Sequence, residues 1–75
     1  MFLTDLEPSQ IGRIVCFEGS DEFLVRLTEM GFKPEQKVRL IRKMAFNGPI
    51  QVRVRNCTIS MRFEDAACIH IELNE

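Results

Sequence analysis

The sequence predicts a mostly β fold with one main helix, in which five short strands close into a small, strongly bent barrel. Two observations support this prediction. Apolar residues recur at helical spacing as far as Gly31, and from Gln36 onward they alternate with polar residues at a period of two. Because no repeat, linker or low-complexity tract interrupts this order, we expect residues 1–75 to form a single domain.

Composition narrows the class of protein. The chain has 75 residues, of which 45% are apolar and 28% charged, as is typical of a small soluble globular domain. The longest apolar runs, residues 14–17 and 66–69, are too short to span a bilayer. The start, MFLTDLE, has no basic segment before an apolar one, and three cysteines give no disulfide framework. These features favour a reduced, cytoplasmic protein.

The first half of the chain is expected to contain one strand and the main helix. The strand covers residues 11–17, with Gly12 and Gly19 as breaks near its ends. The helix covers residues 21–30. Its expected signals are the cap Ser20, the apolar face of Phe23, Leu24, Leu27 and Met30, the terminating Gly31, and Pro34, which cannot continue a helix. We expect this helix to cover one side or mouth of the barrel, with Leu27 and Met30 buried.

The second half is expected to contain four strands with alternating apolar residues. They lie in QKVRLIRK (36–43), PIQVRVRN (49–56), CTISMR (57–62) and ACIHIEL (67–73), and FEDA (63–66) forms a single helical turn. Arg55 and Asn56 make a short hairpin connection, since Asn tolerates positive φ. The residues expected on the inner face are Val38, Leu40, Ile50, Val52, Val54, Cys57, Ile59, Met61, Ala67, Ile69, Ile71 and Leu73.

Three stretches from Leu27 onward carry a family resemblance. They are LTEMGFKPEQKVRLI, with a helix end, Gly, Pro and strand; KMAFNGPIQVRV, with Ala-x-x-Gly-Pro before a strand; and TISMRFEDAACIHIEL, with a strand, Arg, acidic turn, Ala and final strand. In this order the chain resembles the ferrous-iron transport accessory family (FeoA). Two positions depart from the family pattern, Glu35 and Asn56, where Gly is common. Both fit turns that do not strictly need Gly.

The resemblance implies an SH3-like barrel and a cytoplasmic accessory role in ferrous iron transport and iron homeostasis, with transition metal ion binding known at family level. The implied partner is a membrane ferrous permease with a cytosolic GTP-binding domain, so this chain would be peripheral to the membrane only through its partner. The chain has no G-x-x-x-x-G-K-[ST] phosphate loop and no catalytic arrangement, so we expect no enzyme and no cofactor. Stimulation of GTP hydrolysis, gating and assembly remain open, as does homo-oligomer formation.

The charge distribution is polarised. Seven basic residues and no acidic one lie between Gln36 and Arg62, whereas the rest of the chain has three basic and eleven acidic residues. The segment could be a docking face for an acidic protein or for phosphates, or the solvated face of edge strands that discourages aggregation. Nucleic-acid binding is the alternative function, but it needs aromatic platforms, and the segment offers only Phe46. We therefore expect no nucleic acid partner. A free-standing iron-repressor-like SH3 domain is a further alternative.

The best candidate for the partner surface is the connection KMAFNGP, residues 43–49. Met44 and Phe46 would form its apolar centre, and Arg42, Lys43 and Arg53 would supply charge at the rim. In the alternative, Phe46 folds back and plugs the barrel mouth.

A metal site has weaker support. Cys68, His70 and Glu72 alternate along the last strand and share one side of it. Same-face neighbours on a strand lie about 6–7 Å apart, which is too wide for three compact ligands. We therefore expect no metal site there, and we expect Cys16 and Cys57 to be small core residues.

Overall fold

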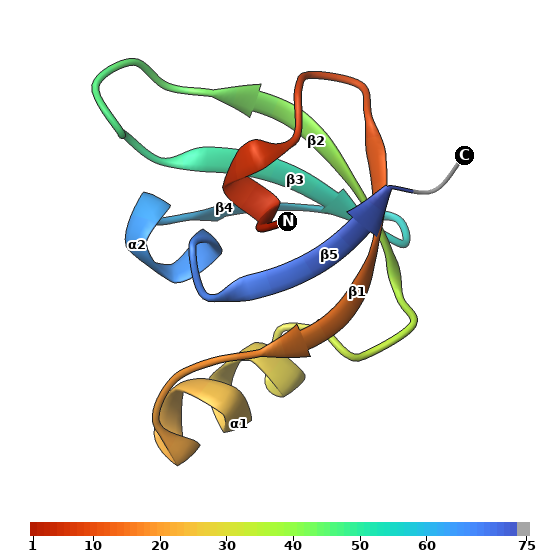
Figure 1. Ribbon diagram of the computed structural model, residues 1–75, viewed down its shortest axis with the longest axis vertical. Coiled ribbons are helices and arrows are strands. Elements are labelled where there is room, and N and C mark those ends of the chain that lie inside the picture. Colours follow the sequence, from red (N-terminus) through yellow and green to blue (C-terminus); the bar gives the residue numbers. More distant parts are fainter. Residues whose placement is uncertain (74–75) are drawn as a thin grey trace.

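The computed structural model describes residues 1–73 and shows a curled five-stranded antiparallel sheet around one apolar core (Figure 1). The strands are β1 (Ile11–Phe17), β2 (Lys37–Lys43), β3 (Ile50–Val54), β4 (Cys57–Met61) and β5 (Ile69–Leu73). The helices are α1 (Asp21–Glu29), α2 (Phe63–Ala66) and the short 3-10 helix η1 (Leu3–Asp5). The mostly β fold with one main helix is confirmed; η1 is an element that the sequence patterns did not indicate. No helix of the described chain is long and apolar enough to cross a membrane.

The strand order in the sheet is β4-β3-β2-β1-β5. Within residues 1–73 no ladder joins β4 to β5, so the expected closure of the strands on each other is not seen. The reason is that the N-terminal segment occupies the outer edge of β5: Phe2 bridges His70, and the Ile71 N–H donates to the Met1 carbonyl at 2.8 Å. Leu3, which η1 places against β5 and α2, is fully buried.

Two irregularities bend the sheet. The pairing of β1 with β5 shifts between Ile14 and Cys16, and the pairing of β2 with β3 shifts between Leu40 and Arg42. Such bulges bend a strand and interrupt its inward and outward alternation. Cys16 is consequently exposed, although it would share the inner face with Ile14 in a regular strand. Cys57, the residue with which β4 begins beside the hairpin turn, is exposed too. The expectation that these cysteines are core residues was wrong.

Helix α1 begins and ends where the sequence predicts. The Ser20 Oγ accepts the Phe23 N–H at 3.2 Å, and Gly31 has a φ of 101°, in the left-handed region. Leu27 is confirmed in the core at 1% exposure, where α1 lies near one end of the curled sheet (Figure 1). Met30 is 37% exposed, so its expected burial was wrong. As the C-cap residue it lies where the chain leaves the helix.

The inner face of the sheet is confirmed at most positions, with corrections near strand ends. Ala67 is half-buried in the turn after α2, and Leu73 is 41% exposed at the end of β5. The remaining expected inward residues of β2, β3 and β5 are buried, as is Met61, while Ile59 is partly buried against the core. Gly12 does not break the strand: it is the second residue of β1, and it is buried against Ile71 of β5.

Two turns differ from the sequence interpretation. In the β3–β4 hairpin, the positive φ belongs to Arg55, at 58°, and not to Asn56. Before β2, Glu35 has a φ of 74°. This left-handed conformation favours glycine, but Glu adopts it here, so the turn forms without Gly at a cost in backbone strain.

Candidate partner-binding surface

The connection between β2 and β3, residues 44–49, is called here the β2–β3 loop, and it protrudes from the sheet (Figure 1). Two backbone hydrogen bonds close it, from the Met44 N–H to the Pro49 carbonyl and from the Gly48 N–H to the Ala45 carbonyl, both at 3.1 Å. These bonds close the connection into a tight turn.

The apolar side chains of the β2–β3 loop are exposed. Phe46 is fully exposed and Met44 is 45% exposed. The alternative in which Phe46 plugs the barrel mouth was therefore wrong. Phe46 and Asn47 have φ values of 59° and 56°. For a bulky residue such as Phe, this left-handed region is strained. An exposed aromatic side chain held on strained backbone is a feature that folding alone does not explain.

The three basic residues predicted for the rim do not lie together. Arg42 is exposed and adjacent to the loop. Lys43 is half-buried, because its Nζ donates to the Thr4 carbonyl at 3.2 Å and lies 4.0 Å from a Glu7 carboxylate oxygen. Arg53 lies opposite Arg39 on β2, towards the other end of β3.

The sequence interpretation did not select the residues around Arg53 as a separate site. They are Lys37, Arg39 and Arg55, which line a cleft together with Arg53. The signal that could have grouped them is the alternation of β2 and β3, since each of the four is next to a buried Val, either Val38 or Val54.

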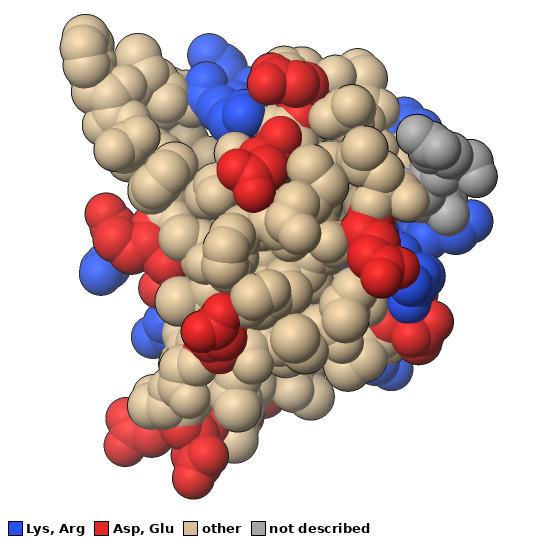
Figure 2. Space-filling view, in the orientation of Figure 1, with Lys and Arg blue, Asp and Glu red and all other residues tan. Residues whose placement is uncertain are grey.

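The polarised charge distribution is visible on the surface. On the face shown in Figure 2, acidic side chains are spread over the surface, while most of the Lys and Arg side chains lie at its margins. The basic residues of β2 and β3 point away from the core, because the residues that alternate with them are buried.

The weak metal candidates are engaged with different partners. The Cys68 Sγ lies 3.5 Å from the Glu64 carbonyl oxygen, which can accept its S–H. His70 contacts the Glu18 carboxylate through Nε2, and its ring lies 4.4 Å from that of Phe2. Glu72 forms an ion pair with Arg13. Cys68 also precedes β5, so the three residues do not alternate along one strand. Residues 1–73 contain no group of three His, Cys, Asp or Glu side chains that could hold a metal ion.

Comparisons with known proteins place this fold in a family. Residues 1–73 match the FeoA domain. A Porphyromonas gingivalis protein, the Fe(2+) transport protein A/Fe(2+) transporter FeoB fusion protein, is 33% identical over 73 residues, which are 97% of this chain and 9% of that protein. The solution structure of iron(II) transport protein A from Clostridium thermocellum is 30% identical, with a TM-score of 0.90 over 97% of this chain and 45% of that one. The chain thus spans less than half the length of either protein.

A third similarity concerns the fold alone. The zinc complex of FeoA from Stenotrophomonas maltophilia, a prokaryotic SH3 domain protein, is 22% identical, with a TM-score of 0.82 over 96% of this chain and 89% of that one. The expected SH3-like fold is therefore confirmed. FeoA domains are accessory domains and not enzymes, in agreement with the function class that the sequence predicts. From the match over residues 1–73, the chain belongs to the FeoA domain family.

Proposed function

We propose that this chain is a cytoplasmic accessory domain of ferrous iron uptake that binds the cytosolic part of a membrane ferrous permease with a GTP-binding domain. The P. gingivalis relative supports the partner, because its name joins protein A and the FeoB transporter in one polypeptide. Fusion makes the encounter of two domains intramolecular. A contact between two such domains still requires a complementary surface on each of them.

The observation that carries this proposal is the fully exposed Phe46 at the tip of the β2–β3 loop. Protein interfaces have an apolar, often aromatic centre and a charged rim. Phe46 and the half-exposed Met44 would form the centre, and the neighbouring Arg42 would supply charge that speeds association. We assign the centre of the docking surface to Met44 and Phe46, with Arg42 and Lys43 at its border.

The test is Phe46→Ser, with binding to the purified cytosolic domain of the permease from the same organism measured by calorimetry. Truncating an aromatic residue at the centre of an interface costs about 2 kcal/mol or more, so we expect affinity to fall roughly thirtyfold. The melting temperature should stay within a few degrees, as is usual for exposed positions. Val25→Ser is the matched control, because Val25 is an apolar side chain, 57% exposed, on α1 and away from the loop.

The possible failures are distinguishable. If the wild-type chain does not bind the permease domain, the proposed partner is wrong. If Phe46→Ser is stable and binds normally, the partner stands and the docking surface is wrong. The rate of GTP hydrolysis, measured in the same mixtures, separates stimulation of the GTPase from assembly alone.

The nucleic-acid alternative gains no support from the geometry. Single-strand binding combines a basic groove with aromatic side chains on which bases stack. The cleft around Arg53 has no aromatic side chain in its lining, and Phe46 lies on the loop beyond the opposite end of β3. The basic and aromatic parts of such a site are therefore separated.

A further inference from the structure

Four basic side chains converge on the outer face of the sheet, away from the β2–β3 loop. They line an open cleft of about 340 Å³, called here the basic cleft, whose lining residues are Ile11, Gln36, Lys37, Val38, Arg39, Arg53 and Arg55. Lys37 and Arg39 are exposed on β2, where they flank the buried Val38. Arg53 and Arg55 flank the buried Val54 in the same way. The backbone alternation thus directs Lys37, Arg39 and Arg53 to one side, and Arg55, in the turn after β3, lines the same cleft.

No ion pair with a described residue compensates the charges of the basic cleft. Arg39 lies directly opposite Arg53 in the β2–β3 ladder, and like charges in this arrangement destabilise a sheet. Among the described residues, Lys37, Arg39 and Arg53 form no ion pair, and Arg55 donates only to the neutral Gln36, at 3.3 Å.

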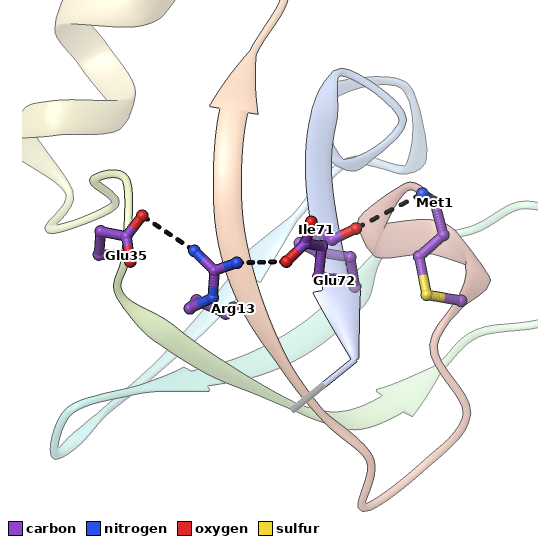
Figure 3. A network of polar contacts seen from close by, with 5 residues as sticks. All are labelled: Met1, Arg13, Glu35, Ile71 and Glu72. Carbon is purple, nitrogen blue, oxygen red and sulfur yellow. Dashed lines mark hydrogen bonds and ion pairs between the residues drawn. The ribbon is translucent and has the colours of Figure 1, made fainter. Parts of the chain in front are cut away.

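The adjacent strand shows the opposite arrangement. Arg13 on β1 forms ion pairs with both Glu35 and Glu72 (Figure 3). Arg13 lies opposite Lys37 in the β1–β2 ladder, so acidic side chains reach the border of the basic cleft, where they pair with Arg13. Within residues 1–73, the basic cleft is a local concentration of positive charge without ion pairs.

Protection of a sheet edge does not account for these cations. Lys and Arg discourage aggregation when they lie on an edge strand with free backbone groups. Here β2 and β3 are interior strands, and the edges of the sheet are β4 and β5. The positive charge therefore lies where the sheet has no edge to protect.

The spacing of the cations selects the shape of the anion. Same-face residues on one strand are about 6–7 Å apart, and directly opposite residues on neighbouring strands are about 5 Å apart. These separations spread the four cations over an area larger than one phosphate group. Carboxylates at alternate positions of an extended peptide repeat at the same 6–7 Å or so, and Arg pairs with a carboxylate through two parallel hydrogen bonds.

We propose that the basic cleft binds an extended acidic segment of a partner protein, with carboxylates at alternate positions that pair with Lys37, Arg39, Arg53 and Arg55. This surface is separate from the β2–β3 loop. Arg39 pairs with Arg53 near the end of β3, whereas the loop leads into the start of β3, where Ile50 pairs with Lys43. The proposal does not depend on the permease or on Phe46. The segment binds here whichever protein carries it.

The experiment titrates the full chain with two capped peptides of equal composition, Ser-Glu-Ser-Glu-Ser-Glu-Ser and Ser-Ser-Glu-Glu-Glu-Ser-Ser, and follows backbone amide shifts at about 0.15 M salt. We expect the alternating peptide to bind several times more tightly and to shift the amides of β2 and β3 next to the cleft. The double variant Arg39→Gln, Arg53→Gln should bind it roughly tenfold more weakly, through lost charge-assisted hydrogen bonds. The control Lys33→Gln, Arg62→Gln removes the same charge from exposed positions outside the cleft and should keep the wild-type affinity.

A second measurement uses the like-charge pair. Arg39→Gln should raise the melting temperature, because it removes repulsion from Arg53. Arg42→Gln should not raise it, since Arg42 lies opposite the neutral Gln51.

Several outcomes would overturn the proposal. If the cleft variant and the control variant lose the same affinity for the alternating peptide, binding depends on overall charge and not on the cleft. Equal affinity for the two peptides, or no binding of either, would exclude the alternating register. Sodium triphosphate or an oligothymidylate could shift the same amides and bind more tightly than the alternating peptide. That result would show that the cleft binds phosphates or nucleic acid instead.

Discussion

Arg13 on β1 donates through Nη1 to the Glu35 carboxylate at 2.9 Å (Figure 3). The pair joins β1 to the turn before β2, where Glu35 has a φ of 74°. A left-handed conformation costs a residue other than Gly about 1–2 kcal/mol. The ion pair offsets only part of this cost, because Glu35 is 76% exposed at the side chain and exposed pairs contribute about 0–1 kcal/mol.

The first prediction separates backbone strain from the ion pair by comparing Glu35→Gly with Glu35→Ala. Both variants lose the contact with Arg13, but only Ala keeps the strained φ. We expect the Gly variant to have a free energy of unfolding about 1 kcal/mol higher than that of the Ala variant. Urea unfolding of both proteins measures this difference. Equal stabilities would mean that residue 35 is not left-handed in solution.

The second prediction concerns the packing of α1. Leu27 is 1% exposed, so Leu27→Ala should lower the free energy of unfolding by about 2–4 kcal/mol, through lost burial and the cavity left behind. Met30→Ala is the control on the same helix, and it should cost far less, because Met30 is 37% exposed. Thermal or urea unfolding reports both values. A Leu27→Ala protein as stable as the wild type would remove this side chain from the core.

Local sequence signals were sufficient for most of the fold. The Ser20 cap, Gly31 and the alternation in β2 and β3 act over a few residues, and the structure confirms the elements that they predict. The family resemblance added the SH3-like architecture, which alternation alone does not specify.

The features that the sequence did not predict depend on contacts between distant segments. The pairing of Phe2 with His70, which occupies the edge of β5, joins the two ends of the chain. The exposure of Cys16 follows from a bulge that no local pattern marks. Within the candidate docking surface, the exposed centre at Met44 and Phe46 was predictable from the short loop, whereas the position of Arg53 required the strand register.

The third prediction tests the close approach of β1 and β5 at Gly12. A Cβ at this position would lie 2.7 Å from Cδ1 of Ile71, which is itself buried. Gly12→Ala should therefore destabilise the protein by about 1–3 kcal/mol through overpacking. The control is the double variant Gly12→Ala, Ile71→Val, in which the clashing methyl group is absent.

The two substitutions at this contact should not be additive. Ile71→Val alone should cost about 0.5–1.5 kcal/mol. The double variant should be more stable than the sum of the single effects indicates, as residues in contact generally show. Additive effects in a double-mutant cycle would mean that the destabilisation does not arise from the contact between residues 12 and 71.

The last prediction concerns metal binding at the end of the chain. Cys68, His70 and Glu72 contact the Glu64 carbonyl, Glu18 and Arg13 respectively, and Cys68 lies outside β5. A divalent ion would have to break these contacts and bring the three side chains together, although alternate strand positions are about 6–7 Å apart. Calorimetric titration of the reduced protein with Fe²⁺ or Zn²⁺ should therefore show no stoichiometric complex.

The double variant Cys68→Ser, His70→Ala completes this test. It should titrate with Fe²⁺ and Zn²⁺ as the wild type does, and it should keep the affinity for the permease domain, since neither residue belongs to the β2–β3 loop. Its stability must be measured in parallel, because His70 contacts Phe2 at the edge of β5. A tight one-to-one complex in the wild type that is abolished in a stable double variant would establish a metal site here. In that case the ion would have to displace the contacts of His70 with Glu18 and of Glu72 with Arg13.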